Sequence, residues 1–304
     1  MTQALIHLSD PHLSSLAGVR PAELLSKRLL GYLSWRRRRR DAHRRELLDR
    51  LTADFAGTDG TIVVTGDLTH IGLESEFEAA AAWLASLGPA SQVALVPGNH
   101  DATVGASLPL QRRYLADWLA GDDGGGSETA WPSLRVRGEV ALIGLDSAVA
   151  TAPGLATGRV GAGPLGRLPA LLADCRARGL FRVVYLHHCP LPGVDRRRKC
   201  LVNAVAVSEA IAGGGAELVL HGHGHRDQRH ALATADGPAP VIAAPSASAR
   251  GGHGRPPAAY HRFTVARTAS GWDLGITTRG LGASGAIETL RTGQVSLRRA
   301  AGES

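Results

Sequence analysis

The sequence predicts an α/β fold in which a second β-sheet packs against a first, largely parallel sheet. Short runs rich in Val, Ile and Leu recur along the chain and alternate with segments of helical length, which is typical of βαβ units. From residue 239 onward, strand-like runs instead follow one another through turns with little helix between them. The chain has 304 residues, of which 44% are hydrophobic, so it can bury a substantial core.

Six apolar runs are predicted to be buried strands. Each is short, rich in Val, Ile or Leu, and ends in a polar or glycine-rich loop. They lie at residues 4–8, 61–65, 92–96, 140–145, 182–186 and 217–220.

Helices are predicted at residues 21–56, 74–87, 109–120, 164–178 and 204–212. The second of these has the clearest boundaries. Glu74 and Glu76 place acidic side chains at its N-terminus, and Gly88 followed by Pro89 ends it.

The C-terminal part of the chain is predicted to form the second sheet, from runs at 239–246, 258–267 and 271–280. We expect one domain over residues 1–285, with a basic helical insertion at about 20–56, and a C-terminal tail over 286–304 whose last dozen residues fray. Residues 121–127 are expected to be a flexible surface loop.

Composition narrows the partners and the compartment. The net charge of +7 favours a polyanionic partner: nucleic acid, an anionic membrane face or a phosphorylated substrate. The three cysteines have no CxxC spacing, which argues against a disulfide framework and favours a cytoplasmic protein. No apolar run reaches the roughly 18 residues of a membrane span, and the N-terminus lacks a signal-peptide pattern.

Potential metal ligands follow five of the six predicted strands. In open α/β sheets, ligands bind beyond the carboxyl ends of the strands. Each group alone has an ordinary explanation as a turn or surface loop, but composition does not explain the recurrence after five strands. The donors are oxygen and nitrogen without thiolate, which suits Mn²⁺, Fe or Zn²⁺. The residues are Asp10 and His12; Asp67; Asn99 and His100; His187 and His188; and His221, His223 and His225.

Five short segments, D-P-H, G-D-L-T, G-N-H-D, H-H-x-P and G-H-G-H, occur in this order between residues 10 and 225. Together they resemble the signature of the calcineurin-like metallophosphoesterases. The resemblance implies a four-layer αββα sandwich of two mixed β-sheets flanked by helices, with a dinuclear metal centre at the C-terminal ends of the strands. The G-N-H-D segment in a chain of this length looks most like the bacterial phosphodiesterase branch.

The resemblance also implies the ligands of two metal ions. One ion would be bound by Asp10, His12, Asp67 and His225, and the other by Asp67, Asn99, His187 and His223, with Asp67 bridging. His187 is preferred to His188 as the ligand, His221 is expected to be the last strand residue or a supporting group, and His70 to lie in a loop. We expect Gly222 and Gly224 to let the chain turn so that His223 and His225 reach different ions.

The implied reaction is attack of a metal-bound hydroxide on phosphorus, most simply in a phosphodiester. His100 would then give a proton to the leaving group, and Asp101 would hydrogen-bond the His100 imidazole and orient it. The alternative is that His100 only braces its loop. The branch that cleaves UDP-diacylglucosamine typically carries Arg at this position, so His100 counts against that substrate.

The basic segment 24–50 has three interpretations. Leucines, Tyr32 and Trp35 precede five consecutive arginines, Arg36 to Arg40. The segment is an insertion helix with a solvated arginine face, an interfacial helix that docks a lipid or nucleotide-lipid substrate at an anionic membrane face, or, less favoured, a nucleic-acid contact. A second basic run, Arg196 to Lys199, follows the H-H-x-P segment and is close enough in sequence to approach a substrate phosphate.

One alternative of another class is a basic nucleic-acid- or membrane-binding protein with a structural metal site. The complete ligand set favours the enzyme, because a degenerate relative is expected to lose some ligand positions.

Overall fold

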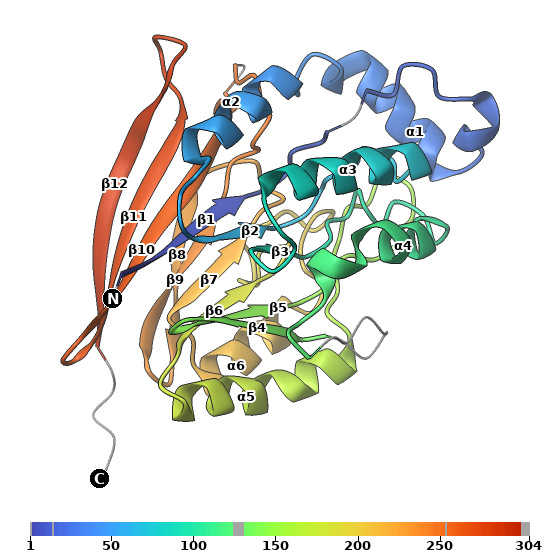
Figure 1. The fold of residues 1–304 in the computed structure, drawn as a ribbon. Helices are drawn as coiled ribbons and strands as arrows, with labels where there is room; N and C mark the ends of the chain where they lie inside the picture. The colour runs from blue at the N-terminus through green and yellow to red at the C-terminus, as the bar shows by residue number, and fades with distance from the viewer. Residues whose placement is uncertain (1, 14, 124–130, 253, 299–304) are drawn as a thin grey trace.

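The computed structural model describes residues 2–13, 15–123, 131–252 and 254–298. Two six-stranded β-sheets pack face to face, with helices on both outer faces (Figure 1). The expected four-layer αββα sandwich of two mixed sheets is therefore confirmed.

The first sheet has the strand order β12-β11-β10-β1-β2-β3. Its strands β1, β2 and β3 run parallel, and β10, β11 and β12 continue the sheet as antiparallel neighbours beyond β1. The bounds are β1 (Thr2–Leu8), β2 (Thr61–Val64), β3 (Val93–Leu95), β10 (Ala259–Thr268), β11 (Gly271–Leu281) and β12 (Ile287–Arg298).

The second sheet has the strand order β4-β5-β6-β7-β9-β8. Its strands β5, β6, β7 and β9 run parallel, and an antiparallel strand closes each edge. The bounds are β4 (Ser133–Arg137), β5 (Val140–Gly144), β6 (Phe181–Tyr185), β7 (Leu218–His221), β8 (Gln228–Thr234) and β9 (Gly237–Ala243).

We had expected the C-terminal strands to form the second sheet by themselves, but they do not. β9 joins β7 in the second sheet, whereas β10 and β11 extend the first sheet from β1. All six predicted strands are present, but they are divided between the two sheets. Which sheet a strand joins depends on pairing with distant segments, and a local hydrophobic pattern does not encode that pairing.

Most of the expected C-terminal tail is also a strand. β12 pairs with β11 along its length, from Ile287 opposite Leu281 to Arg298 opposite Gly271. Its side chains are mostly exposed, so the run lacks the apolar alternation that marks a half-buried strand. Residues 299–304 lie outside the described residues.

The helices form the two outer layers (Figure 1). α2, α3 and α4 pack on the outer face of the first sheet through residues such as Leu51, Phe77 and Leu115. α5 and α6 pack on the outer face of the second sheet through residues such as Leu172 and Ile211. The bounds are α1 (Lys27–Ser34), α2 (Arg45–Phe55), α3 (Glu74–Leu87), α4 (Ser107–Leu119), α5 (Ala162–Ala177) and α6 (Ala204–Gly214).

The largest apolar cluster between the sheets joins inward-facing residues of both, including Val63 and Phe263 of the first sheet and Val183 and Leu220 of the second. Burial of this surface is the main force that holds the layers together. Within the described ranges, no helix combines the length and the apolar character needed to cross a bilayer.

The basic insertion is helical but broken. A 3₁₀ turn, η1 (Pro21–Leu24), leads into α1, which continues as the π-helical segment η2 (Trp35–Arg39) before α2 begins at Arg45. Trp35 is only 6% exposed and packs with Leu16, Ile71 and Leu73, so it does not belong to an exposed apolar face. The side chains of Arg38 and Arg39 lie outside the described part of the structure.

Candidate metal centre

The predicted ligands gather where the carboxyl ends of parallel strands from both sheets meet. β1, β2 and β3 of the first sheet and β6 and β7 of the second lead into the loops that carry them. Because the two sheets are stacked, loops that are far apart in sequence deliver side chains to one place.

The first predicted ligand set, Asp10, His12, Asp67 and His225, converges. One ligand atom from each residue lies within 4.8 Å of the others. Asp10 Oδ1 is 3.0 Å from His225 Nε2, and His12 Nε2 is 4.0 Å from Asp67 Oδ2. The carboxylates and the His12 ring are buried, so this group has the donors and the enclosure of a metal site.

The second predicted set adjoins the first through Asp67. His187 Nε2 lies 3.4 Å from Asp67 Oδ2 and 3.2 Å from Asn99 Oδ1. Ring nitrogens of His187, His188 and His223 lie within 4.8 Å of one another. Asp67 therefore touches both sets, as a bridging carboxylate must.

The backbone at the ligands adopts a conformation that side chains other than Gly rarely take. Among the described residues, the non-glycine positions with positive φ are Asp10, His12, Asp67, His223 and His225, with φ between 42° and 66°. All five are predicted ligands. Such strain costs of order 1–3 kcal/mol per residue and clusters at functional sites, where the surrounding structure maintains it.

The role of Gly222 differs from our expectation. Neither Gly222 nor Gly224 has a positive φ; the left-handed turns occur at His223 and His225 instead. A Cβ on Gly222 would lie 1.8 Å from Ser9 Oγ and 2.8 Å from Asp10 Oδ2. Gly222 is thus required for close approach to the β1 loop, which brings His223 N within 3.0 Å of Asp10 Oδ2.

The protonation states of His12, His223 and Asp10 fit cation binding. Burial holds the pKa of His12 and of His223 well below the ordinary value, so both rings are neutral. Burial opposes ionisation of Asp10, but His225, His187 and the Ser9 hydroxyl together outweigh it and lower the pKa of that carboxyl. The buried Nε2 atoms of His12 and His223 have no hydrogen-bond partner among the residues that the structure describes. Neutral imidazoles with unpaired nitrogens beside carboxylates are the form in which these residues bind metals.

The other ring nitrogen of two predicted ligands is fixed by the backbone. His12 Nδ1 is 2.9 Å from the Thr69 carbonyl, and His187 Nδ1 is 2.6 Å from the Thr65 carbonyl. Because an N–H must donate to each carbonyl, Nε2 is left to face the centre.

His100 and Asp101 are both at the centre, but they are not partners. His100 Nδ1 is 2.6 Å from the carbonyl of His70, and the His100 backbone N–H donates to Asp67 Oδ1 at 2.8 Å. Asp101 instead accepts from the backbone N–H groups of Asp67, Thr69 and Gly98, each at 2.9 Å. The expectation that Asp101 orients the His100 ring is therefore wrong: the carboxylate shapes the loop that carries Asp67.

The surplus histidines lie around the centre. His188 Nδ1 is 2.8 Å from Ser147 Oγ, whereas the neighbouring His187 faces Asp67 and Asn99. The contact of His187 with Asp67 supports the preference for His187; a ring nitrogen of His188 also lies within 4.8 Å of those of His187 and His223, so His188 stays an alternative ligand. His221 is the last residue of β7, and the His70 ring stacks on that of His12 with centroids 5.0 Å apart.

A cleft of about 380 Å³ opens over the centre. Asn99, His100 and His70 line its inner end. Its walls carry Lys27 from α1 and, from the loop after β6, the cations Arg196, Arg198 and Lys199. Any anion that reaches the centre through this cleft passes these four positive charges.

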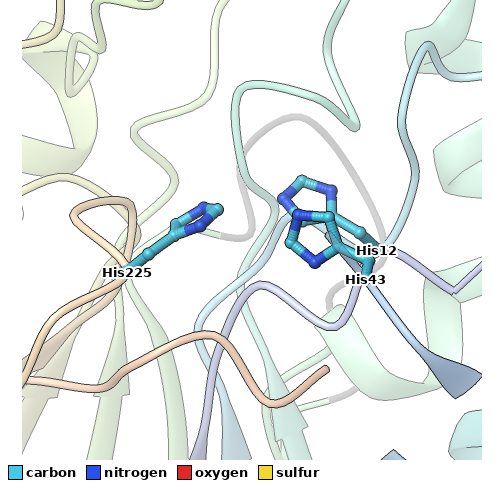
Figure 2. A group of neighbouring side chains, drawn as sticks. All are labelled: His12, His43 and His225. Carbon is cyan, nitrogen blue, oxygen red and sulfur yellow. The ribbon is translucent and has the colours of Figure 1, made fainter. Parts of the chain in front are cut away.

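Two residues of this region were not predicted. Lys27 bridges the cleft, with Nζ 2.5 Å from Thr151 Oγ1 and 3.0 Å from the Leu155 carbonyl. The ring of His43 approaches those of His12 and His225 (Figure 2). Both residues lie in the basic insertion, where the arginine run is the dominant sequence pattern. Because neither residue directly follows a predicted strand, their positions in the sequence did not indicate a functional role.

Comparison with known proteins agrees with this geometry. The family model described as calcineurin-like phosphoesterase matches residues 4–227, a range that includes every predicted ligand as well as His100 and Asp101. A search of curated proteins finds no match to the chain.

Several solved structures share the fold. A purple acid phosphatase from yellow lupin (Lupinus luteus) seeds aligns with a TM-score of 0.61 and 10% identity over 97% of this chain and 54% of its own, so the chain spans about half of that protein's length. A dimetal phosphatase from Danio rerio aligns with a TM-score of 0.55 and 13% identity over 95% of this chain and 98% of its own. An NAD nucleotidase from Haemophilus influenzae aligns with a TM-score of 0.51 and 12% identity over 96% of this chain and 54% of its own. At these identities the likeness establishes the fold alone.

Proposed function

The chain belongs to the calcineurin-like phosphoesterase family, and from this premise of metal-dependent phosphoester hydrolysis we propose that the protein is a phosphodiesterase. The observation that carries the proposal is the convergence of two ligand sets on Asp67, next to a cleft that the ligand Asn99 lines and whose walls carry cations. A diester needs room beside the scissile phosphate for its second arm, and the cleft supplies that room.

The protein would hold one ion with Asp10, His12, Asp67 and His225, and the other with Asp67, Asn99, His187 and His223. When bound, two such ions supply charge neutralisation of the phosphate and activation of water. We propose Mn²⁺, Fe or Zn²⁺, because the donors are imidazole nitrogens and carboxylate or amide oxygens.

We propose that His100 transfers a proton to the leaving group. Two observations support this role: Nδ1 donates to the His70 carbonyl, which fixes the ring, and His100 lines the cleft beside Asn99. Nε2 would then face the leaving oxygen. In the doubly protonated ring, Nε2–H would donate to that oxygen.

The cations in the cleft favour a substrate whose leaving arm carries further negative charge. Arg196, Arg198 and Lys199 line the cleft and are exposed, and Lys27, which also lines it, is held by Thr151 and the Leu155 carbonyl. A nucleotide-like or pyrophosphate-containing arm would bring a second phosphate beside them.

The test is a substrate panel with metal-reconstituted enzyme. We expect diesters to be cleaved with a higher kcat/KM than the corresponding monoesters. Arg198→Gln and Lys199→Gln should each raise KM for a diester with a charged arm by roughly fivefold, since one exposed charge contributes about 1 kcal/mol. A small diester with an uncharged arm should respond to neither.

Arg197→Gln is the matched control, because Arg197 is also exposed but does not line the cleft. Monoesters turning over faster than all diesters would refute the phosphodiesterase assignment. An equal effect of all three substitutions would refute the role of the cleft cations.

A second candidate is a lipid-linked phosphoester or pyrophosphate as substrate. Leu30 and Leu155 line the cleft and are 52% and 38% exposed, and Leu25 and Leu29 are exposed on the same side of the insertion. Apolar side chains at the mouth of a cationic cleft suit a headgroup that stays attached to acyl chains. Faster turnover of a nucleotide-lipid than of the matching lipid-free diester would favour this candidate.

A further inference from the structure

His43 lies between η2 and α2, and its ring reaches the first ligand set (Figure 2). One ring nitrogen from each of His12, His43 and His225 lies within 4.8 Å of the others. His12 and His225 are also members of the set that contains Asp10 and Asp67. The ring centroid of His43 is 4.5 Å from that of His12 and 5.7 Å from that of His225. His43 therefore borders the position of the same ion.

The backbone around His43 is tied to the loop that supports Asp10. His43 forms an antiparallel bridge with Ala249, Arg44 N donates to the Ser248 carbonyl at 2.8 Å, and Arg250 N donates to the Ala42 carbonyl at 2.8 Å. In the same loop, Ser246 Oγ donates to the Asp10 carbonyl at 2.7 Å. These contacts fix the position of the insertion relative to Asp10, and a metal ligand needs its position to be fixed in this way.

The His43 ring is oriented as the predicted ligands are. Its Nδ1 lies 2.8 Å from Ser248 Oγ, just as His12 and His187 each place Nδ1 against a backbone carbonyl. Metal-binding histidines bind through one nitrogen while the other is held by a hydrogen bond. The Ser248 contact therefore assigns Nε2 of His43 to the centre.

We propose that His43 is a fifth protein ligand of the ion bound by Asp10, His12, Asp67 and His225. The basic insertion then contributes a ligand to the metal centre. Three imidazoles and two carboxylates make this site richer in nitrogen than the family's set alone, which favours Zn²⁺, Fe or Co²⁺ over Mg²⁺. The proposal rests on the two-ion centre but not on any substrate.

Metal binding without substrate tests this assignment. Metal-free wild type, His43→Ala and His43→Gln are titrated with Co²⁺ and followed by calorimetry and visible absorption. We expect two ions per wild-type chain, with one of them weakened at least about tenfold in both variants and the other unchanged. The d–d absorption of the weakened site should also change, because one imidazole nitrogen is lost from the coordination sphere.

His230→Ala is the control, since His230 is an exposed histidine on β8. Circular dichroism and thermal unfolding of the metal-free proteins establish that both His43 variants fold. Wild-type affinity and spectrum in folded His43→Ala would overturn the proposal. A failure of wild type itself to bind two ions would instead overturn the dinuclear centre.

Discussion

Asp67 is held from three directions at once. Its backbone N–H donates to Asp101, its Oδ1 accepts from His100 N, and its Oδ2 lies near both His12 and His187. A left-handed backbone, with φ of 57°, aims the carboxylate between the two ligand sets. Because Oδ2 lies between members of both ligand sets, loss of Asp67 should affect both ions.

We predict that Asp67→Ala lowers the affinity for both ions, whereas wild type holds about two per chain. Elemental analysis after dialysis against metal-free buffer measures the content. Asp49→Ala, an exposed carboxylate on α2, should leave it unchanged. Fully active wild type with a single tightly bound ion would contradict the dinuclear centre.

His100 has a prediction that separates proton transfer from phosphate positioning. His100→Ala should retain both ions, because its imidazole is outside the two ligand sets. It should lose roughly 10²–10⁴-fold in kcat on diesters with alkyl leaving groups and much less on p-nitrophenyl esters, whose leaving group departs without a proton. Steady-state kinetics on a matched pair of diesters decides the matter. Equal losses on both esters would mean that His100 positions the phosphate.

At this scale, residue types after strands indicated the ligands, because oxygen and nitrogen donors recurred at five strand ends. The sequence did not indicate which groups would be the hydrogen-bond partners of these side chains. Asp101 is adjacent to His100 in sequence, yet its oxygens accept from three backbone N–H groups, two in the loop after β2 (Asp67 and Thr69) and one in its own loop (Gly98). His43 follows no strand and reaches the centre only because residues 42–44 pair with residues 248–250.

At the scale of elements, a partly buried ion pair helps to attach α2 to the first sheet. Asp54 near the end of α2 accepts from Arg279 Nε and Nη2, both at 2.6 Å, and from the Tyr260 hydroxyl at 2.7 Å. The side chains of Asp54 and Arg279 are 17% and 27% exposed. Hydrogen bonding to Arg279 lowers the pKa of Asp54, so the folded state favours the carboxylate.

We predict that Asp54→Asn lowers the free energy of unfolding at pH 7 by about 2 kcal/mol, since charge-assisted hydrogen bonds at a partly buried site are lost. A group with a depressed pKa stabilises the protein above its unfolded pKa of about 3.9 and loses that contribution as pH falls through the folded value. The difference between variant and wild type should therefore shrink below about pH 4.

Urea unfolding at pH 7 and at acidic pH measures this difference. Asp49→Asn is the matched control on the same helix, because Asp49 pairs with Arg45 at 2.7 Å in solvent and such pairs contribute little. A difference between Asp54→Asn and wild type that persists unchanged at low pH would contradict the ionic origin.

Element positions followed from the sequence wherever burial was strong. α3 begins and ends at the residues marked by Glu74 and Gly88, and the six Val-, Ile- and Leu-rich strands lie within a residue or two of their predicted bounds. β12 was not predicted because its side chains are mostly exposed and backbone pairing alone defines it. The break in the insertion was also missed, since Trp35 turns inward and packs with Ile71.

At the scale of the whole molecule, the insertion closes one side of the cleft. Lys27 contacts the loop near Thr151, while Arg28 donates to the carbonyls of Ile71 and Gly72 at 3.2 Å and 2.6 Å. α1 is thereby held against segments that follow strands of both sheets. The insertion also exposes Leu25, Leu29 and, after α1, Arg36, Arg37 and Arg40. A surface of this kind suits an anionic membrane face, which remains a proposal for this chain.

If this surface docks on lipid, binding to anionic vesicles should depend on two contributions. One is burial of Leu25, Leu29 and Leu30, because Trp35 is already packed inside the protein. The other is attraction of roughly 1 kcal/mol per arginine near the surface, which salt screens within a Debye length. Replacing Arg36, Arg37 and Arg40 by Gln should therefore weaken vesicle binding by roughly two orders of magnitude in low salt.

Sedimentation with vesicles that contain anionic lipid, at low salt and near 1 M salt, measures the effect. The triple variant should also turn over a lipid-linked diester more slowly, yet cleave a small soluble diester at the wild-type rate, because none of the three arginines lines the cleft. High salt should reproduce the variant on the lipid substrate. Wild-type protein that ignores anionic vesicles at low salt, where the attraction is strongest, would mean that these arginines form a solvated face and that the exposed leucines serve only the mouth of the cleft.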